Sequence, residues 1–349
     1  MRISIINPGG TSNFGERAIM VGTIYAIKDA YPNSQVAIYG YGSIKSEDRG
    51  VAQFLEQSGV KLFPQIVSGK GIFDKFVCII RLLVQPQRSI GREAYLYLRN
   101  SHRVYAKGQE SLTAAYGWKH LIDSVLEPLI VSRINRNIIL YGHSIGPLYT
   151  HTQTLFAKYA LRQIDRIEVR DSLSREVLKT LGYPSMKYTL VKDLAYVAMK
   201  NLPIARRQYA RDHILVIPNA AIVKSSTEKD KYLSVLKSYI DEQQAKKEEV
   251  IVCSSVTASD WNNDYMLCSE LIRLCPGTRI MRYEGLNEFL TAIKSSKLVI
   301  SSRLHPIIMA TGLETEILAL SNAAKVKGLL NDLGLENRMR EPFTIRAGG

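Results

Sequence analysis

The chain has 349 residues, of which 46% are hydrophobic and 22% are charged. This composition excludes a disordered or fibrous protein, and a usual size of roughly 100–200 residues per domain predicts two globular domains. The formal net charge of +14 favours an anionic partner. Because the chain lacks zinc-finger or basic-zipper spacing and interleaved aromatic and basic residues, we expect a phosphorylated small molecule or an anionic membrane surface rather than nucleic acid.

The cysteines and the amino terminus indicate the cellular compartment of the protein. The four cysteines share no Cys-x-x-Cys spacing, so we expect reduced thiols rather than a disulfide framework. The first apolar run is too short for a signal peptide and is typical of a strand. We therefore expect a cytoplasmic protein, with a peripheral contact at the inner face of the membrane as an open alternative.

The first part of the chain alternates strands and helices, which predicts a parallel α/β sheet. We assign residues 1–200 to this first domain. Strands are expected at residues 3–7, 35–39, 137–141, 167–170 and 188–191, and helices at 16–30, 153–163 and 172–182. Residues 66–136 fit the alternation poorly and are interpreted as a helical insertion, whose apolar residues form packed core or, alternatively, a lipid-contacting face.

A polar and basic stretch at residues 199–212, broken by Pro203, is interpreted as a domain linker. Residues 201–349 are then a second α/β domain. Its expected strands are 214–217, 250–253, 279–282, 298–300 and 316–320, and its expected helices are 262–274, 286–294, a helix from Pro306, and 325–333. Two Rossmann-like domains in tandem predict an active site in the interdomain cleft.

The first strand-to-helix turn carries Pro8-Gly-Gly-Thr-Ser-Asn-Phe-Gly-Glu16. It lacks the Gly-x-Gly-x-x-Gly order and the later acidic residue of a dinucleotide site, which disfavours NAD. Gly15 still allows the backbone to approach a ligand, Asn13 has the groups to hydrogen-bond a sugar hydroxyl, and Glu16 to accept its proton. An ordinary turn and helix start remains the alternative interpretation.

Polar residues follow three further strands of the first domain. His143 and Ser144 lie in the tight glycine-bounded turn Gly142–Pro147, which suits an acceptor sugar, although a turn histidine with satisfied hydrogen bonds would give the same pattern. Arg170 is either a fork for phosphate or carboxylate or a structural partner of an acid, and Asp171 is expected to cap the next helix. Asp193 is either a base or a turn residue.

The stretch Leu298-Val-Ile-Ser-Ser-Arg-Leu-His-Pro306 is the most informative of the second domain. It places Arg303 and His305 between a strand and a helix that Pro306 is expected to open. The carboxyl end of a strand and the amino end of a helix together favour phosphate and carboxylate ligands. The chain has no His-Glu-x-x-His motif, cysteine cluster or Asp-x-Asp pair, so we expect no metal and no cofactor; the absence of a P-loop and of Gly-x-Ser-x-Gly disfavours kinases and hydrolases.

These motifs together resemble the polysaccharide pyruvyl transferase family, and the resemblance runs through both domains. Asn13-Phe-Gly-Glu16 resembles the family's Asn-x-Gly-Asp, with glutamate in place of aspartate, and His143 stands where glutamine is common. The remaining matching residues are Gly142–Pro147, Val169–Ser174, Asp193, and Ser302-Arg-Leu-His305 followed by Lys325 and Gly328.

The resemblance implies a GT-B-like fold and transfer of the pyruvyl group of phosphoenolpyruvate to two hydroxyls of a sugar as a cyclic ketal. The implied donor site lies in the second domain, at the motif containing Ser302, Arg303 and Leu304, with cations also from Arg170 and Lys325. His305 would act as the acid, and Glu16 or Asp193 as the base. Asn13, Gly15, His143 and Ser144 would bind the sugar acceptor, which is free or lipid-linked. The rival interpretations are a GT-B glycosyltransferase with a nucleotide-sugar donor and an inactive sugar- or phosphate-binding protein.

Overall fold

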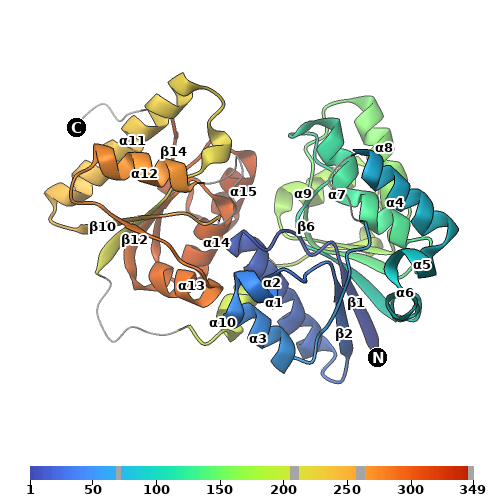
Figure 1. Ribbon diagram of the computed structural model, residues 1–349. Helices are drawn as coiled ribbons and strands as arrows, with labels where there is room; N and C mark the ends of the chain where they lie inside the picture. The colour runs from blue at the N-terminus through green and yellow to red at the C-terminus, as the bar shows by residue number, and fades with distance from the viewer. Residues whose placement is uncertain (68–71, 205–211, 257–263, 345–349) are drawn as a thin grey trace. The chain divides into compact units, whose positions relative to one another are not determined.

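The computed structural model of the protein describes residues 1–67, 72–204, 212–256 and 264–344 (Figure 1). The chain forms two compact units, each built on its own parallel sheet. The first unit comprises Met1–Gly10, Ile19–Ser46 and Ala52–Val197. The second unit comprises Ala198–Gly349 together with two short segments from early in the chain, Thr11–Ala18 and Glu47–Val51. Within the described ranges, no helix is both long and apolar enough to cross a bilayer.

The sheet of the first unit has the strand order β3-β2-β1-β4-β6-β7-β8, with β5 paired to β6. Every pairing in it is parallel. The chain starts near the middle, moves to the β3 edge, and returns to β4 before continuing to β8, which is the winding of a doubly wound fold. Its strands are β1 (Arg2–Ile6), β2 (Gln35–Tyr39), β3 (Lys61–Phe63), β4 (Arg103–Lys107), β5 (Glu110–Ser111), β6 (Ile138–Ile145), β7 (Arg166–Val169) and β8 (Tyr188–Leu190).

Helices cover both faces of this sheet (Figure 1). Three of them lie on one face, α1 (Phe14–Ala30), α3 (Arg49–Gln57) and α10 (Leu194–Asn201). The opposite face carries α4 (Ile72–Val84), α7 (Gly117–Val131), α8 (His151–Leu161) and α9 (Ser172–Thr180). The short helices are α2 (Ile44–Glu47), α5 (Pro86–Ile90) and α6 (Arg92–Arg99).

The helical insertion predicted at residues 66–136 is only partly helical, and this prediction is corrected. Helices α4 to α7 do lie in this range, but Arg103–Lys107 form β4, which pairs with β1 and β6 at the centre of the sheet. A central parallel strand normally appears as a run of apolar residues. β4 has only five residues and begins and ends with a basic one, although Lys107 is fully buried, so the sequence hides it.

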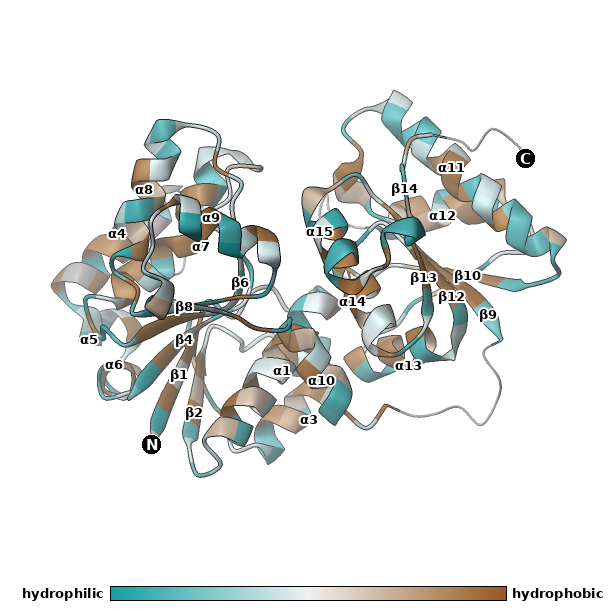
Figure 2. Cartoon of the chain, turned by 180° about the vertical axis from the view of Figure 1, so that it is seen from behind, coloured by the Kyte–Doolittle hydropathy of each residue, from teal (hydrophilic) through white to brown (hydrophobic). Residues whose placement is uncertain are grey.

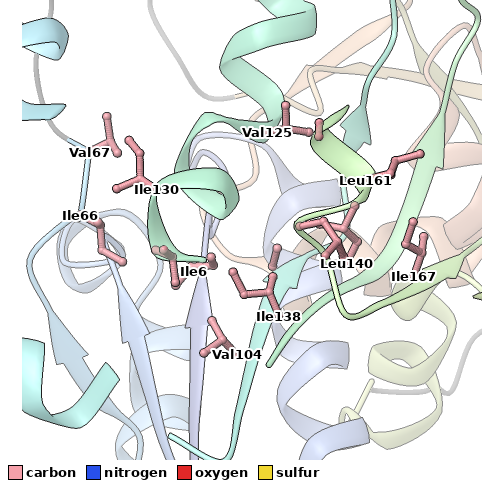
Figure 3. Close-up of a cluster of buried hydrophobic side chains, with 14 of the residues drawn as sticks. Ile6, Ile66, Val67, Val104, Val125, Ile130, Ile138, Leu140, Leu161 and Ile167 are labelled. Carbon is pink, nitrogen blue, oxygen red and sulfur yellow. The ribbon is translucent and has the colours of Figure 1, made fainter. Parts of the chain in front are cut away.

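The core of the first unit lies between the sheet and the α7 and α8 layer (Figure 3). Val125 and Ile130 on α7 and Leu161 on α8 face strand residues of the same cluster. The strand side comes from the four neighbouring strands β1, β4, β6 and β7. Its residues are Ile6, Val104, Ile138, Leu140 and Ile167. Burying apolar side chains of this size contributes roughly 1.5–3 kcal/mol each, so this layer stabilises the unit substantially.

The sheet of the second unit has six parallel strands in the order β11-β10-β9-β12-β13-β14. They are β9 (His213–Ile217), β10 (Glu249–Cys253), β11 (Arg279–Met281), β12 (Ser296–Ser301), β13 (Glu316–Leu320) and β14 (Met339–Arg340). The helices are α11 (Ser226–Ala245), α12 (Tyr265–Leu274), α13 (Leu286–Ser295), α14 (Leu304–Gly312) and α15 (Ala324–Leu333). The central strands are predominantly apolar (Figure 2), as expected for strands covered on both faces.

The predicted linker at residues 199–212 begins inside a helix, because α10 continues to Asn201. Residues 205–211 of that linker lie outside the described part of the chain. Strand β9 follows at His213 and is buried along its whole length.

Two early segments complete the core of the second unit. Phe14 stacks on Phe289 of α13 with ring centroids 4.5 Å apart, and both rings are fully buried. Arg17 forms a buried ion pair with Asp48 at 3.0 Å and donates to the carbonyl of Glu284 at 2.8 Å. The Asp48 carboxylate also accepts the backbone N–H of Leu286 at 2.8 Å. The buried Arg17 charge is therefore compensated by both an acid and a carbonyl.

Candidate active site

The turn that carries Arg303 and His305 lies where the sequence predicts it, between β12 and α14. The helix begins at Leu304 rather than at the predicted Pro306, so His305 is in its first turn. Arg303 is the residue just before the helix, and its backbone N–H donates to Ser301 Oγ at 3.0 Å. The guanidinium and the imidazole are thus attached to a backbone that two regular elements hold in place.

The Arg303 guanidinium forms an ion pair with Asp264, an acid that the sequence analysis did not identify. Arg303 Nε donates to Asp264 Oδ2 at 2.8 Å and Nη2 donates to Asp264 Oδ1 at 2.6 Å, which is a bidentate pair. The Asp264 side chain is fully buried, and Oδ1 also accepts the backbone N–H of Ala220 at 2.8 Å. Burial raises the pKa of Asp264, and the positive charge of Arg303 offsets part of that rise. The pair fixes the plane of the guanidinium.

Ser302 is buried and acts inside the turn. Tyr232 on α11 donates its hydroxyl proton to Ser302 Oγ at 2.7 Å, and Asn219 Nδ2 donates to the Ser302 carbonyl at 3.2 Å. The Tyr232 oxygen in turn accepts the backbone N–H of Asn219 at 3.1 Å. Burial raises the pKa of Tyr232, so this hydroxyl keeps its proton and stays a donor. These hydrogen bonds of Ser302 support the turn that carries Arg303.

The Asn13–Glu16 motif and the Arg303–His305 motif belong to the same unit and touch. Asn13 Oδ1 accepts the backbone N–H of Gly15 at 2.8 Å at the start of α1, and Asn13 forms a β-bridge with Val256. A Cβ atom placed on Gly15 would lie only 2.3–2.5 Å from Cγ, Nδ1 and Cβ of His305. Only glycine fits beside this imidazole. Glu16 follows in the first turn of α1.

Lys325 and Leu304 complete the predicted donor residues. Lys325 is half-buried in the first turn of α15, directly after β13, and Leu304 is the first residue of α14, directly after β12. β12 and β13 are adjacent parallel strands. Their carboxyl ends lie at one edge of the sheet, so Arg303, His305 and Lys325 are attached to the same edge, as the sequence predicts for phosphate-binding residues.

In the first unit, Arg170 is at the centre of a buried polar cluster. Arg170 Nη1 contacts Asp193 Oδ2 at 2.8 Å, and both side chains are only 5% exposed. Arg170 Nε donates to Ser144 Oγ at 2.8 Å, and Ser144 donates to Asp171 Oδ2 at 2.5 Å. Of the two interpretations of Arg170, the structural pair with an acid is the one that this geometry shows.

The acids of this cluster also cap helices. Asp171 Oδ1 accepts the backbone N–H of Ser174 at 2.7 Å, so the predicted cap of α9 is confirmed. Asp193 Oδ1 accepts the backbone N–H of Ala195 at 2.8 Å at the start of α10. β6, β7 and β8 are neighbours, so the cluster occupies the carboxyl edge of their part of the sheet.

The structure places His143 in a strand, not in the glycine-bounded turn that the sequence predicts. β6 continues to Ile145, with an irregularity at Gly142 (φ +73°), and His143 is a fully buried strand residue. Its Nε2 lies 3.0 Å from the Ala106 carbonyl and its Nδ1 lies 2.7 Å from Ser111 Oγ. A carbonyl only accepts, so Nε2 carries the proton and Nδ1 accepts from the serine. Glycine in the left-handed region lets the strand continue where the sequence suggested a turn.

Another buried acid of the first unit was also missed. Glu127 on α7 is 6% exposed, and its Oε1 accepts the backbone N–H of Asn7 at 2.7 Å, just beyond β1. Burial raises the pKa of Glu127 to about 7, although the backbone N–H donors of Asn7 and Val67 lower it in part. Neither Glu127 nor Asp264 stands in a recognisable motif, so only the fold reveals them. In the described residues, no group of three or more His, Cys, Asp or Glu side chains is arranged to hold a metal ion.

Solved structures similar to this chain share its fold. The UDP-GlcNAc 2-epimerase from Methanocaldococcus jannaschii is 10% identical, with a TM-score of 0.60 over 98% of this chain and 89% of that one. The enzyme from Neisseria meningitidis bound to UDP-GlcNAc is 11% identical, with a TM-score of 0.58 over 99% and 96% of the two chains. At such identities the likeness concerns the fold alone, and it confirms the predicted GT-B-like pair of parallel α/β sheets.

No curated protein matches the chain in sequence. The family described as polysaccharide pyruvyl transferase matches residues 13–323, a range that starts at Asn13 and includes the Arg303 turn. The match therefore includes both motifs that meet at Gly15 and His305. The chain belongs to the polysaccharide pyruvyl transferase family, and this membership implies a transferase that acts on a saccharide.

Proposed function

We propose that the protein transfers the pyruvyl group of phosphoenolpyruvate to two hydroxyls of a sugar in a polysaccharide or its lipid-linked precursor, forming a cyclic ketal. The observation that carries the proposal is the contact between the Asn13–Glu16 and Arg303–His305 motifs, where the Gly15 backbone lies against the His305 imidazole. This contact brings a candidate acid, a candidate base and a cation onto one unit of the protein.

The donor is an anion with a phosphate and a carboxylate, and the residues proposed to bind it suit that charge. Arg303 and Lys325 supply cations at one edge of the second sheet, and the amino end of α14 adds backbone N–H groups that favour an anion. Asp264 pairs with the Nε and Nη2 edge of Arg303 and so fixes the orientation in which the guanidinium would meet the donor. Leu304 contributes from the same turn.

In the proposed reaction His305 protonates the methylene carbon of the enol, which leaves a cation at the second carbon. One sugar hydroxyl adds to that carbon and gives up its proton to a base. A second hydroxyl of the same sugar then displaces phosphate, and its proton also leaves to solvent or base. One ketal and one inorganic phosphate are formed, and no oxidation or reduction occurs.

We assign the base to Glu16 rather than Asp193. Glu16 lies in the same first turn of α1 as Gly15, which contacts His305. The two oxygens of Asp193 already accept from Arg170 and from the Ala195 backbone. The proposal gives Asn13 and Gly15 to the acceptor, and gives the Arg170, Asp193 and Ser144 cluster the role of holding the edge of the first sheet rigid.

The proposal is tested by calorimetric titration with phosphoenolpyruvate and, separately, with uridine and guanosine diphosphate sugars. We expect phosphoenolpyruvate to bind and Arg303→Ala to weaken its binding by at least about tenfold, because a charge-assisted hydrogen bond to an anion contributes about 1.5–3 kcal/mol. Arg338→Ala is the matched control, since the Arg338 side chain is exposed and lies 3.7 Å from the exposed Glu316.

Binding of a nucleotide sugar without phosphoenolpyruvate would contradict the donor assignment and favour a glycosyltransferase. Phosphoenolpyruvate binding without release of phosphate on any sugar acceptor, including lipid-linked ones, would instead favour a binding protein. Release of one phosphate per ketal formed is the result expected of the enzyme.

A further inference from the structure

The helix layer formed by α4, α7 and α8 presents a second apolar surface, directed away from the sheet. Large apolar side chains on these helices are 40–70% exposed. We call this set the outer apolar face; it consists of Phe76, Ile80, Val84, Trp118, Ile122, Leu155 and Tyr159.

The spacing of these residues shows that they form stripes along the helices. Phe76, Ile80 and Val84 repeat every four residues on α4, and Trp118 and Ile122 do so on α7. Residues four apart lie on one side of a helix. Other residues of the same helices pack in the core of the unit, such as the buried Leu82 on α4 and Leu121 on α7. The exposed stripes are therefore additional to the faces that pack on the sheet.

The three helices are neighbours in one layer (Figures 1 and 2). α4 packs beside α7, and the Trp118 ring meets Phe156 of α8 edge to face with centroids 6.2 Å apart. Because each helix turns its buried side to the same sheet, their exposed sides point the same way. On the opposite face of the sheet, the described residues of α1, α3 and α10 include no exposed large apolar side chain. Among these six helices, the exposed large apolar side chains are thus all on α4, α7 and α8.

Basic residues accompany this face. Among the described side chains of these helices and the residue after α8, Arg81, Lys119 and Arg162 are exposed and Lys158 is half-buried. The acids on the same helices that are not buried are Asp74 and Asp123. Lys119 lies 3.9 Å from Asp123, and the four cations outnumber the two acids, so these described side chains carry a net positive charge. Lys158 on α8 and Arg162, the residue directly after it, are two of these cations, and α8 contains no acid. A second copy of the chain packed on this face would bring cations against cations, whereas an anionic surface complements them.

We propose that the outer apolar face of α4, α7 and α8 docks on an anionic lipid bilayer. Aliphatic and aromatic side chains inserted among the acyl chains, with Trp118 and Tyr159 at the level of the headgroups, and basic side chains at the rim are the features of an interfacial protein surface. The inference goes beyond the proposed reaction and does not depend on it, because it rests on a surface of the first unit alone. It gives the enzyme a place from which a lipid-linked acceptor is within reach.

The test is co-sedimentation of the full chain with vesicles of phosphatidylcholine, with or without about one third phosphatidylglycerol. We expect binding to the anionic vesicles that weakens as salt is raised. The variant Phe76→Ser/Ile80→Ser/Trp118→Ser should bind at least about fivefold less, and Lys158→Gln/Arg162→Gln should lose most of the preference for phosphatidylglycerol. Met266→Ser/Leu274→Ser on α12 removes equally exposed apolar residues of the second unit and should bind as the unchanged protein does.

Three results would overturn the proposal: no binding to anionic vesicles, binding that the α4 and α7 substitutions leave unchanged, or an equal loss with the α12 variant. A fourth is an oligomer in light scattering that the α4 and α7 substitutions convert to monomer, since the face would then be a contact between copies. Phosphate release from phosphoenolpyruvate with a water-soluble sugar acceptor should be the same in all variants, so a failure here is separate from a failure of the proposed reaction.

Discussion

The imidazole of His143 is enclosed by protein, with hydrogen-bond partners at both nitrogens. Burial lowers its pKa to about 3, with the nearby Arg170 and Lys107 charges acting in the same direction. A histidine in an unfolded chain titrates near pH 6.5. Between these values the unfolded chain binds more protons than the folded one, so the histidine's contribution to stability is complete above about pH 6.5 and is lost as the pH falls toward 3.

We expect His143→Gln to remove this sensitivity to acid. The amide can still donate to the Ala106 carbonyl, but it does not titrate. In urea denaturation at pH 7 and at about pH 4.5, the difference in unfolding free energy between variant and unchanged protein should move by about 2–3 kcal/mol in favour of the variant at the lower pH. The exposed His102→Gln serves as the control. Parallel pH profiles for the His143 variant and the unchanged protein would contradict the expectation.

We treat Asp264 as a positioning residue, because its carboxylate accepts two hydrogen bonds from Arg303 and one from the Ala220 backbone. Asp264→Asn preserves the size of the side chain but removes the negative charge and one acceptor. We expect the KM for phosphoenolpyruvate to rise about tenfold with a small change in kcat, since a guanidinium without its bidentate partner no longer holds one orientation. Steady-state kinetics measure this. A loss of thermal stability with an unchanged KM would mean that the pair serves only the fold.

At the scale of elements, the first turns of α1 and α14 meet at one point, where Gly15 leaves room for His305. We expect Gly15→Ala to displace the imidazole and lower kcat at least about tenfold, and to cost about 1–3 kcal/mol of stability through overpacking. Gly42→Ala is a suitable control, because an added Cβ there has no neighbour within 4 Å. Phosphate release and denaturation midpoints give both quantities; normal turnover in Gly15→Ala would remove the contact from the mechanism.

The elements that sequence reasoning found are those with a strong local pattern. β2 and β13 were predicted with the boundaries they have, because β-branched and apolar runs end at turn residues. The helix α11 was not predicted, although Ser225 caps it by accepting the N–H of Glu228, as a serine three residues before a glutamate suggests. Its buried positions are separated by many charged residues, which obscured the apolar stripe.

The residues of the candidate site also fall into those that the sequence predicts and those that it does not. The Arg303 turn was predictable because a strand pattern, a proline and two functional side chains occur together in sequence. Asp264 and Tyr232 were not, since they reach this turn from residues 39 and 70 positions away and each stands in an unremarkable context. Likewise the glycine-bounded sequence around His143 is compatible with a turn or a strand. The strand continues because Gly142 adopts a positive φ there.

At the scale of the whole molecule, the division between units does not coincide with a single cut in the sequence. A fragment of residues 198–349 would contain the whole second sheet but not Phe14, Arg17 or Asp48. Phe289 would lose its stacked partner, and deleting a buried phenylalanine costs about 3–5 kcal/mol, a large part of the about 5–15 kcal/mol that stabilises a typical domain.

We therefore expect the 198–349 fragment to lack a cooperative thermal transition and to bind a hydrophobic dye, as measured by circular dichroism and fluorescence. Full-length Phe14→Ala should show an intermediate effect, with a lowered but cooperative transition. A fragment that unfolds cooperatively at the temperature of the intact chain would show that the two early segments contribute little.

The contacts of Phe14 and Gly15 with α13 and α14 also set an order of events during synthesis. Phe14 and Gly15 leave the ribosome first, whereas Phe289 and His305 are added about 275–290 residues later, which at about 5–20 residues per second is about 15–60 s. Throughout that interval the Phe14 ring has no aromatic partner and the pocket beside Gly15 has no imidazole. The Asn13–Glu16 motif is therefore without its partner motif until Arg303 and His305, at the start of α14, have been synthesised.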